Sequence, residues 1–538
     1  MYRSNPFLLT EEDLERVRTP VLDESSAYAI EVHLLEEIVN KSITETGKVL
    51  VQTRLLNPLT SLREIKRRQD SLREIRSNDK LKQALIDFLS RVKEHEEKTS
   101  EFVKGSFYAC SEVYDVQADA RSTIQQIPKW ALDIPQPQSE YLAELKKALT
   151  DLKKSPTRGL VSGPLFHQWF RGGEVLAWNE LKPYIPAFPF VPFPIKLSRV
   201  IPSVAVGAAF GIAAYSDAMS KGKPEEMTMG GIMALLGSMA GAKIGNMWGQ
   251  SADCKLFLKP LSRRLQNDEI AQNSFLAIGC LDELVAYDEF GKGLKVSTLP
   301  EVYASPKHEF YSEGLINPVQ SKTIPNYVPN DVHLSNGQRL TFFTGPNSGG
   351  KTSLGKSIAQ TQLLSQIGCY VSAVNARVSL ADNIFYQIGK GDSLEDSEGG
   401  LGAQLGQTRN IFRTCSPQSL VIVDDLIEGT TFKEKTEQTR DALYGFLHKG
   451  TNIIYITHHY ELAQEFQENG VGRFLQVEFN GTLPTHRFIP GISTNSHADI
   501  VAKRVGFDKA SMEQHLRENR YLTEEQSFED ISRYKYKC

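Results

Sequence analysis

The 538-residue sequence has little cysteine and no closely spaced cysteine pair. Its six cysteines are dispersed, and no two of them form a Cys-x-x-Cys motif. The dispersal and the missing Cys-x-x-Cys pair favour free thiols over a structural zinc site or a disulfide framework. Free thiols are typical of a reducing compartment. We therefore expect a cytoplasmic protein, with membrane association through residues 200–247 as the alternative.

An excess of positive charge is also absent. The 61 Lys and Arg residues are outnumbered by 65 Asp and Glu residues, which gives a formal net charge of −4. A global basic field for nucleic acid is thus excluded. Local basic clusters occur at residues 63–68, Arg73 and residues 262–264, and we interpret them as solvated helix faces rather than phosphate tracks. The first residues lack the apolar core of a secretory signal.

A complete phosphate-binding loop is present. Residues 345–352 read Gly-Pro-Asn-Ser-Gly-Gly-Lys-Thr, between an apolar run at 340–344 and a helical pattern at 354–366. Glycines in this pattern let backbone N–H groups close around phosphate oxygens. We expect Lys351 to reach the β/γ-phosphates and Thr352 to ligate Mg²⁺. The predicted phosphate-binding residues are Gly345, Pro346, Asn347, Ser348, Gly349, Gly350, Lys351 and Thr352.

Two aspartates follow a second apolar segment. Residues 419–423 read Ser-Leu-Val-Ile-Val, the form of a buried parallel strand, and Asp424 and Asp425 come directly after them. The carboxyl ends of such strands lie beside the phosphate loop in a doubly wound sheet. We expect Asp424 to hold Mg²⁺ and Asp425 to orient or deprotonate the attacking water. The alternative is an aspartate pair that caps the next helix.

A third apolar segment, residues 452–457, leads into His458 and His459. A histidine at this strand end can sense a γ-phosphate, and His458 is our candidate. A lone histidine is more often structural. The prediction for His458 therefore depends on its position at the end of the strand.

Eight segments in the same order resemble the MutS family of mismatch-repair-type ATPases. Gly345–Ser353 is close to the family's GPNxGGKST loop, and residues 457–462 resemble its THYxEL element. The other similar segments are residues 57–70, 281–288, 327–331, 366–373, 382–389 and 419–431. The resemblance covers much of the chain and implies membership of this family.

The resemblance implies further site residues and partners. The ring of Tyr327 would stack on adenine, with Asn330 on the same side, and Ser353 would belong to the phosphate loop. ATP and Mg²⁺ are implied as cofactors, DNA as a partner, and a homodimer in which each subunit completes its neighbour's site. Residues 492–506 resemble the family's closing helix-turn-helix, which joins two ATPase domains.

The chain departs from the family pattern at several positions. It begins where the family's helical core begins, so we expect no mismatch-reading or connector domain and no classical mismatch recognition. Asp425 stands where the family has a catalytic glutamate, and Asn317 replaces a histidine before Pro318. The Ser-Thr signature that opens a helix and acts on the neighbouring subunit is Gly399-Gly400 here. We expect an active but slow ATPase.

The first half of the chain is predicted to be helical. Apolar residues recur every three or four positions over residues 28–46, 61–100 and 141–154, and again over 256–287. A proline-rich stretch at residues 128–137 predicts a loop between two of these helices.

Two charge-free segments lie between these helices. Residues 200–216 and 227–242 are 17 and 16 residues long, close to the minimum of about 17 for crossing a bilayer. Six of the eight methionines fall between 219 and 247, and glycines repeat at four-residue spacing. We weigh a membrane-inserted hairpin, a buried or self-associating hairpin, and an interfacial segment. In the family, this place holds the DNA-embracing clamp.

The predicted architecture is multidomain. An all-α core and lever domain is followed by an α/β P-loop ATPase domain of the ABC-like type and a C-terminal helix-turn-helix. The predicted parts are a helical region at 1–185, a linker with the apolar hairpin at 186–250, returning lever helices at 251–310, the ATPase domain at 311–490, and the helix-turn-helix with its tail at 491–538.

Three functions fit these observations. The first is a dimeric ATPase whose nucleotide state controls binding to DNA structures rather than mismatches, in a repair or recombination role. The second is a membrane-attached ATPase that acts through the apolar hairpin. The third is a nucleotide-dependent scaffold with slow turnover. We favour the first, because the ATPase, lever and dimer elements all belong to it.

Overall fold

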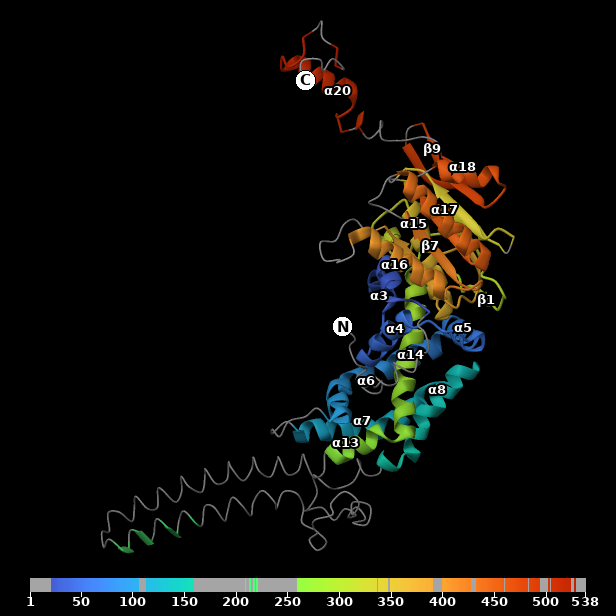
Figure 1. Ribbon diagram of the computed structural model, residues 1–538. Helices are drawn as coiled ribbons and strands as arrows, with labels where there is room; N and C mark the ends of the chain where they lie inside the picture. Colours follow the sequence, from blue (N-terminus) through green and yellow to red (C-terminus); the bar gives the residue numbers. More distant parts are fainter. Residues whose placement is uncertain are drawn as a thin grey trace. The chain divides into compact units, whose positions relative to one another are not determined.

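The computed structural model divides into two compact units, and each brings together distant parts of the chain (Figure 1). Unit 1 comprises the described residues within 36–57 and 63–293, and unit 2 comprises those within 21–35, 58–62 and 294–528. The described residues are 21–105, 113–158, 209, 212–213, 216–217, 219–220, 259–335, 337–346, 349–389, 399–426, 432–458, 460–481, 483–493, 502–503, 505–523 and 527–528.

Unit 1 is helical, as its periodic apolar pattern predicts. Its longer helices are α4 (Glu45–Leu56), α5 (Leu62–Ser77), α6 (Asp79–Lys104), α7 (Val113–Asp133), α8 (Glu140–Asp151), α13 (Lys259–Gln266) and α14 (Glu269–Gly293). Helix α14 packs against α4, α6 and α8, and α6 packs against α7 (Figure 1). Because it touches helices on several sides, α14 is buried along most of its middle.

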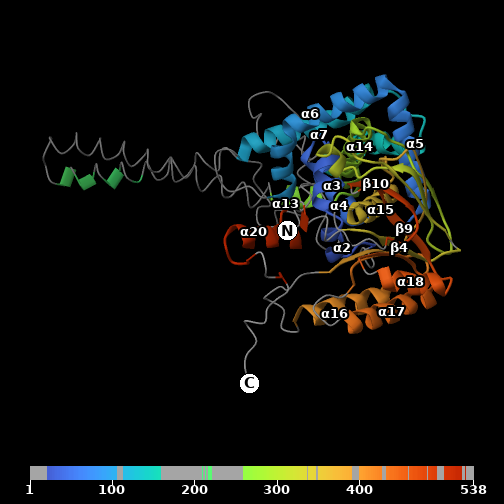
Figure 2. The same ribbon diagram turned by 90° about the horizontal axis from the view of Figure 1, so that it is seen from above.

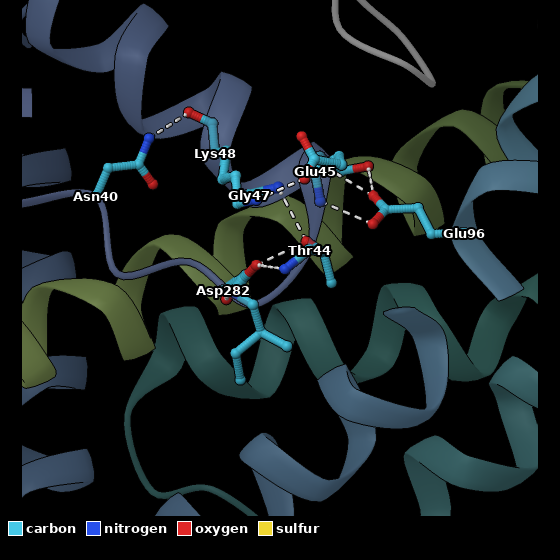
Figure 3. Close-up of polar contacts among 9 residues, drawn as sticks. Asn40, Thr44, Glu45, Gly47, Lys48, Glu96 and Asp282 are labelled. Atoms are coloured by element: carbon cyan, nitrogen blue, oxygen red, sulfur yellow. Dashed lines mark hydrogen bonds and ion pairs between the residues drawn. The ribbon is translucent and has the colours of Figure 1, made fainter. Parts of the chain in front are cut away.

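Two buried carboxylates bind the N-terminus of α4 (Figure 3). Asp282 of α14 accepts hydrogen bonds from the Ile43 and Thr44 backbone N–H groups (2.9 and 2.7 Å) and from the Thr44 hydroxyl (2.6 Å). Glu96 of α6 accepts from two backbone N–H groups and the Thr46 hydroxyl in the same way. The free N–H groups of a helix start favour anions, so α14 and α6 are both tied to α4.

The burial of Asp282 predicts a pH dependence of stability. Burial raises its pKa to about 6, although the bonds from Thr44 and Ile43 oppose the shift. Between about pH 4 and pH 6 the folded chain then binds more protons at this group than the unfolded chain does. The contribution of Asp282 to the free energy of unfolding should therefore decrease by about 2–3 kcal/mol as the pH rises through this window.

Urea unfolding of the wild type and of Asp282→Asn at several pH values measures this contribution. The difference between the two free energies of unfolding should fall from pH 4 to pH 6 and then level off. The exposed Asp133, which pairs with Arg91 at 2.8 Å, supplies the control Asp133→Asn. A wild-type minus Asp282→Asn difference that is constant with pH would contradict the assignment.

The basic residues of α5 are largely neutralised by carboxylates. Arg68, which we predicted to be solvated, is instead buried and pairs with Glu283 of α14 at 2.7 Å. Arg76 bonds to Asp288, a second buried acid of α14. The sequence prediction for Arg68 is wrong because its partner lies on a helix that is distant along the chain.

Unit 2 contains two sheets. The strands are β1 (Glu301–Tyr303), β2 (Phe310–Leu315), β3 (Asn330–Leu334), β4 (Leu340–Thr344), β5 (Asn375–Ser379), β6 (Ile384–Ile388), β7 (Leu420–Asp424), β8 (Asn452–Thr457), β9 (Arg473–Asn480) and β10 (Leu483–Pro490). The larger sheet has the order β10-β9-β4-β8-β7-β6, parallel from β9 to β6, with β10 antiparallel to β9. The smaller sheet has the order β1-β5-β2-β3.

Helices cover both faces of the larger sheet (Figure 2). Apolar residues of β4, β7 and β8 form one core with α16 (Gly399–Thr414), α17 (Phe432–Lys449) and α18 (Tyr460–Glu468). Helix α15 (Lys351–Gln366) lies on the other face, where Gly355 approaches Ile456 so closely that a Cβ would stand 2.8 Å from its Cδ1. The helical part followed by mixed α/β sheets agrees with the predicted architecture.

Four predictions for the helices need correction. Residues 28–46 do not form one helix: α3 spans Val32–Val39 and α4 begins at Glu45, because Glu31 has a φ of 60° and Thr44 caps α4. Residues 61–100 form two helices, because Asn78 lies between α5 and α6 and caps α6 through the Leu81 N–H at 3.1 Å. Helix α7 continues through Pro128 to Asp133, so the predicted loop begins too early. The buried Ile124, Ile127 and Ala131 of α7 explain how packing outweighs the lost backbone bond. Residues 256–287 hold α13 and α14 rather than one helix.

The apolar hairpin predicted at 200–247 lies almost wholly outside the described residues. The exceptions, at 209, 212–213, 216–217 and 219–220, are helical. In the part of the chain that the structure describes, every helix is too short or too polar to cross a bilayer. The predicted helix-turn-helix at 492–506 also lies mainly outside, and α20 (Lys509–Glu518) follows it.

Candidate nucleotide-binding site

The predicted phosphate loop connects β4 to α15. Gly345 and Gly350 have φ values of 136° and 88°, a backbone region that favours glycine. A Cβ on Gly349 would stand 2.6 Å from a methyl group of Val477, so the loop also needs glycine for space. Asn347 and Ser348 lie outside the described residues. The remaining loop residues form the strand–turn–helix connection that the sequence pattern predicts.

Lys351 is directed into this loop. Its ammonium group donates to the carbonyl oxygens of Gly345 (2.7 Å) and Pro346 (2.8 Å). Burial lowers its pKa to about 8, while Asp424 and Asp425 favour its charged form. A cation held inside a ring of backbone groups is suited to bind phosphate oxygens.

Thr352 and Asp424 meet beside Lys351. The Thr352 hydroxyl donates to Oδ2 of Asp424 at 2.5 Å. Burial raises the pKa of Asp424, and the hydrogen bond from Thr352 opposes the shift. Among the described residues, no group of three or more His, Cys, Asp or Glu side chains forms a metal cage. A hydroxyl and a carboxylate in contact nevertheless fit Mg²⁺, because this ion needs only a few protein oxygens and takes its other ligands from phosphates and water.

Asp425 and His458 lie at the ends of the adjacent strands β7 and β8. Asp425 has a φ of 48°, which is unusual for a residue other than glycine, and its Oδ1 accepts from the Thr457 hydroxyl at 3.2 Å. Nε2 of His458 lies 3.7 Å from Oδ2 of Asp425, and its Nδ1 lies 3.4 Å from the Lys351 nitrogen. The histidine therefore stands between the phosphate-loop lysine and the candidate base.

Tyr327 lies in the connection between β2 and β3, and Asn330 is the first residue of β3. The Tyr327 hydroxyl and Ser353 are hydrogen-bonded at 2.8 Å. Asn330 is buried, and both ends of its amide bond to the backbone of β10, at His486 O (3.0 Å) and Phe488 N (2.8 Å). The adenine-side roles of Tyr327 and Asn330 stay predictions.

Two residues near the site were missed by the sequence analysis. Gln320 accepts a hydrogen bond from Ser353 and so joins the Tyr327 contact. His486 has a φ of 61°, and its Nδ1 lies 3.6 Å from the place that a Cβ on Gly350 would take. A single histidine in a polar edge strand carries no motif, so only the fold reveals its position beside the loop.

The helix predicted at the Gly399-Gly400 pair is present. Helix α16 begins at Gly399, as the prediction for this segment requires. The beginning of a helix of this length exposes backbone N–H groups that attract anions.

Comparisons with known proteins place the two halves of the chain in one family. The profile of MutS domain III matches residues 22–287, and that of MutS domain V matches residues 341–514. The chain is 28% identical over 257 residues to a protein named endonuclease MutS2 from Ligilactobacillus salivarius, covering 47% of this chain and 32% of that protein.

Two further relatives carry mismatch-repair names. A DNA mismatch repair protein MSH3 from Yarrowia lipolytica is 30% identical over 197 residues, which is 36% of this chain and 20% of that protein. A DNA mismatch repair protein MutS from Caldicellulosiruptor saccharolyticus is 28% identical over 219 residues, or 39% and 25%. The matches thus span a third or less of these curated relatives.

Proposed function

Since this chain belongs to the MutS family, we propose that it binds and hydrolyses ATP with Mg²⁺ and couples its nucleotide state to DNA binding. One observation carries the ATPase proposal. The ends of β4, β7 and β8, which are adjacent and parallel, bring the phosphate-loop lysine, a hydroxyl–carboxylate pair and a second carboxylate together. This combination suits phosphoryl transfer to water.

The residues divide the work between binding and hydrolysis. Lys351 and the loop N–H groups bind the β/γ-phosphates, while Thr352 and Asp424 hold Mg²⁺, which neutralises charge on the phosphate oxygens when bound. Asp425 orients the attacking water and accepts its proton. His458, which lies within 3.4 Å of Lys351, bonds to the γ-phosphate and so reports its presence.

Turnover by this site is slow. Asp425 is one methylene shorter than the glutamate of the family pattern, so water must lie closer to the strand end. The Thr457 hydroxyl holds one carboxylate oxygen at 3.2 Å, which limits how far the group can reach. The Asp425 carboxylate can therefore orient the attacking water, but its short reach slows removal of the proton from that water.

The active form is a homodimer that pairs through the ATPase domains. The N–H groups at the beginning of α16 approach the γ-phosphate of the partner subunit. The family's Ser-Thr hydroxyls are missing at Gly399-Gly400, so this contact is made by the backbone alone.

DNA binding is directed to DNA structure rather than to mismatches. DNA binding as such is supported by the mismatch-repair names of the relatives and by the family membership, and the preference for DNA structure is part of the proposal. The arginines of α5 are poor candidates for the contact, because Arg67, Arg68 and Arg76 are paired with carboxylates.

Binding to a panel of labelled DNAs tests this proposal. The panel contains duplex, mismatched, forked and four-way DNA, each with ADP and with a non-hydrolysable ATP analogue at one fixed low salt concentration. We expect tighter binding to branched DNA than to mismatched duplex, with an affinity that changes with the nucleotide. Phosphate contacts are strongest at low salt, so weak DNA binding is not overlooked there.

The variant Lys351→Ala is the control for nucleotide coupling. Its DNA affinity should be the same with both nucleotides, since it no longer binds either. Absence of binding by the wild type to every DNA at low salt would contradict the DNA part of the proposal and leave the ATPase part standing.

A further inference from the structure

Residues 21–31, here called the N-terminal brace, belong to unit 2 although they lie far from it in sequence. Val21 accepts a hydrogen bond from the Ile384 N–H at 2.8 Å, and Leu22 forms a parallel bridge with Ile384 at the edge of β6. The short helix α2 (Glu24–Ala29) follows, capped by Asp23 through the Ser26 N–H at 2.6 Å.

The brace contacts three elements of the ATPase unit. The Ser26 hydroxyl accepts from the Tyr386 N–H of β6 at 2.9 Å, and the Ser25 hydroxyl accepts from Gln407 of α16 at 2.8 Å. The Ile30 carbonyl accepts from Gln360 of α15 at 2.8 Å. The brace therefore holds the helix of the phosphate loop and the helix α16 against one strand.

Its last residue, Glu31, makes an ion pair with α15. Oε1 of Glu31 lies 2.6 Å from the Lys356 ammonium, and the two side chains are 26% and 12% exposed. Glu31 has a φ of 60°, a conformation that is strained for a glutamate. Because an isolated glutamate would avoid this backbone conformation, the surrounding fold must hold Glu31 in it and so place its carboxylate beside Lys356.

The pair lies close to the metal side of the site. Lys356 is four residues after Thr352 on α15, so the two side chains share one face of the helix. Burial raises the pKa of Asp424, while Thr352, Lys351 and Lys356 oppose that shift by favouring its ionised form. Since the Thr352 hydroxyl donates to Asp424 at 2.5 Å, Lys356 lies one helical turn from the residue that contacts the carboxylate that would hold Mg²⁺.

The charge of Glu31 reaches the same region. The Tyr386 hydroxyl donates to the Thr352 carbonyl at 3.4 Å. Burial raises the pKa of this tyrosine, and the charges of Asp424 and Glu31 add to the effect. Glu31 and Lys356, which carry opposite charges, thus belong to segments that contact the neighbours of Thr352.

We propose that Glu31 and Lys356 are positioning residues of the ATPase site, which set the affinity for Mg²⁺ by balancing charge beside Asp424. This inference rests on the proposed ATPase function. Lys356 repels the cation, and Glu31 cancels this repulsion because its carboxylate is in contact with the ammonium. The negative charge that cancels this repulsion thus comes from the N-terminal brace, which lies far in sequence from the ATPase motifs.

Neutralising one partner at a time separates charge balance from simple support of the fold. In Glu31→Gln, Lys356 is unpaired and should weaken Mg²⁺ binding about three- to tenfold. In Lys356→Gln, Glu31 is unpaired and should strengthen it by a similar factor of about three to ten. The double variant Glu31→Gln/Lys356→Gln should return close to the wild type.

The measurement is Mg²⁺-dependent binding of a fluorescent, non-hydrolysable ATP analogue to the full chain, which does not depend on turnover. The exposed pair of Arg377 and Glu301, joined at 2.8 Å on the smaller sheet, supplies the control Glu301→Gln. This control should leave the Mg²⁺ concentration for half-maximal binding unchanged.

The two single variants give the decisive comparison. Shifts of opposite sign that cancel in the double variant support the proposal. Shifts in the same direction, or no shift while nucleotide binding is intact, overturn it. If the wild type fails to bind the analogue at any Mg²⁺ concentration, the proposed ATPase function fails instead.

Discussion

Substitution of Lys351 by alanine should abolish nucleotide binding, with a loss of affinity of more than about 100-fold. The ammonium group lies between the carbonyls of Gly345 and Pro346, at the centre of the phosphate loop. Its removal takes away the positive charge that the β/γ-phosphates require, and the loop N–H groups alone are neutral. Titration of a fluorescent ATP analogue with the wild type and with Lys351→Ala gives the two dissociation constants that measure the effect.

The control is Lys307→Ala, because Lys307 is an exposed lysine of the same unit. It should bind the analogue as the wild type does. Since Lys351 is buried, circular dichroism of Lys351→Ala is needed to show that the variant is folded. A folded variant that binds ATP with wild-type affinity would contradict the assignment of residues 345–352 as the phosphate loop.

Substitution of Asp425 by asparagine should reduce ATP turnover by about 10²- to 10⁴-fold and leave ATP binding intact. Asparagine has the same size and tolerates the left-handed backbone that Asp425 adopts, with a φ of 48°. The substitution therefore removes the negative charge without disturbing the strand end. Single-turnover hydrolysis and binding of the ATP analogue, measured on the same preparation, separate the two effects.

The exposed aspartate Asp441 of α17 provides the matched control Asp441→Asn, which should hydrolyse ATP at the wild-type rate. An unchanged rate in Asp425→Asn would refute Asp425 as the base. Loss of ATP binding would assign Asp425 to the metal instead of the water. A wild type that binds ATP and shows no turnover would favour the nucleotide-dependent scaffold.

Short-range patterns predicted the secondary structure around the candidate phosphate loop. The loop, the strand before it and the helix after it are adjacent in sequence, so composition and spacing suffice to predict them. The same holds for Asp424, which ends β7, and for Asp425 and His458, which directly follow β7 and β8. Parallel strands in one sheet place their carboxyl ends together, so the meeting of these residues followed from the predicted fold class.

Other features were beyond local patterns. Helix breaks were misplaced at Asn78 and Pro128, because a polar cap and buried packing decide such positions. Arg68 looked like a surface residue until Glu283 was found beside it. The hydrogen bonds of the Asn330 amide to β10 were likewise absent from the sequence analysis, and its adenine-side role stays a prediction. In each case the partner or the packing surface lies outside the segment that was interpreted.

The sequence by itself determined the family, the order of helical and α/β parts, and the strand–loop–helix segment that forms the candidate phosphate loop. These depend on contiguous motifs whose chemistry needs particular residue types at fixed spacing. Only the tertiary structure decided that Glu31 pairs with Lys356, 325 residues away, and that Asp282 binds the beginning of α4, 238 residues from Thr44. Such contacts depend on how distant segments pack, and a pair of charges separated by hundreds of residues produces no local pattern.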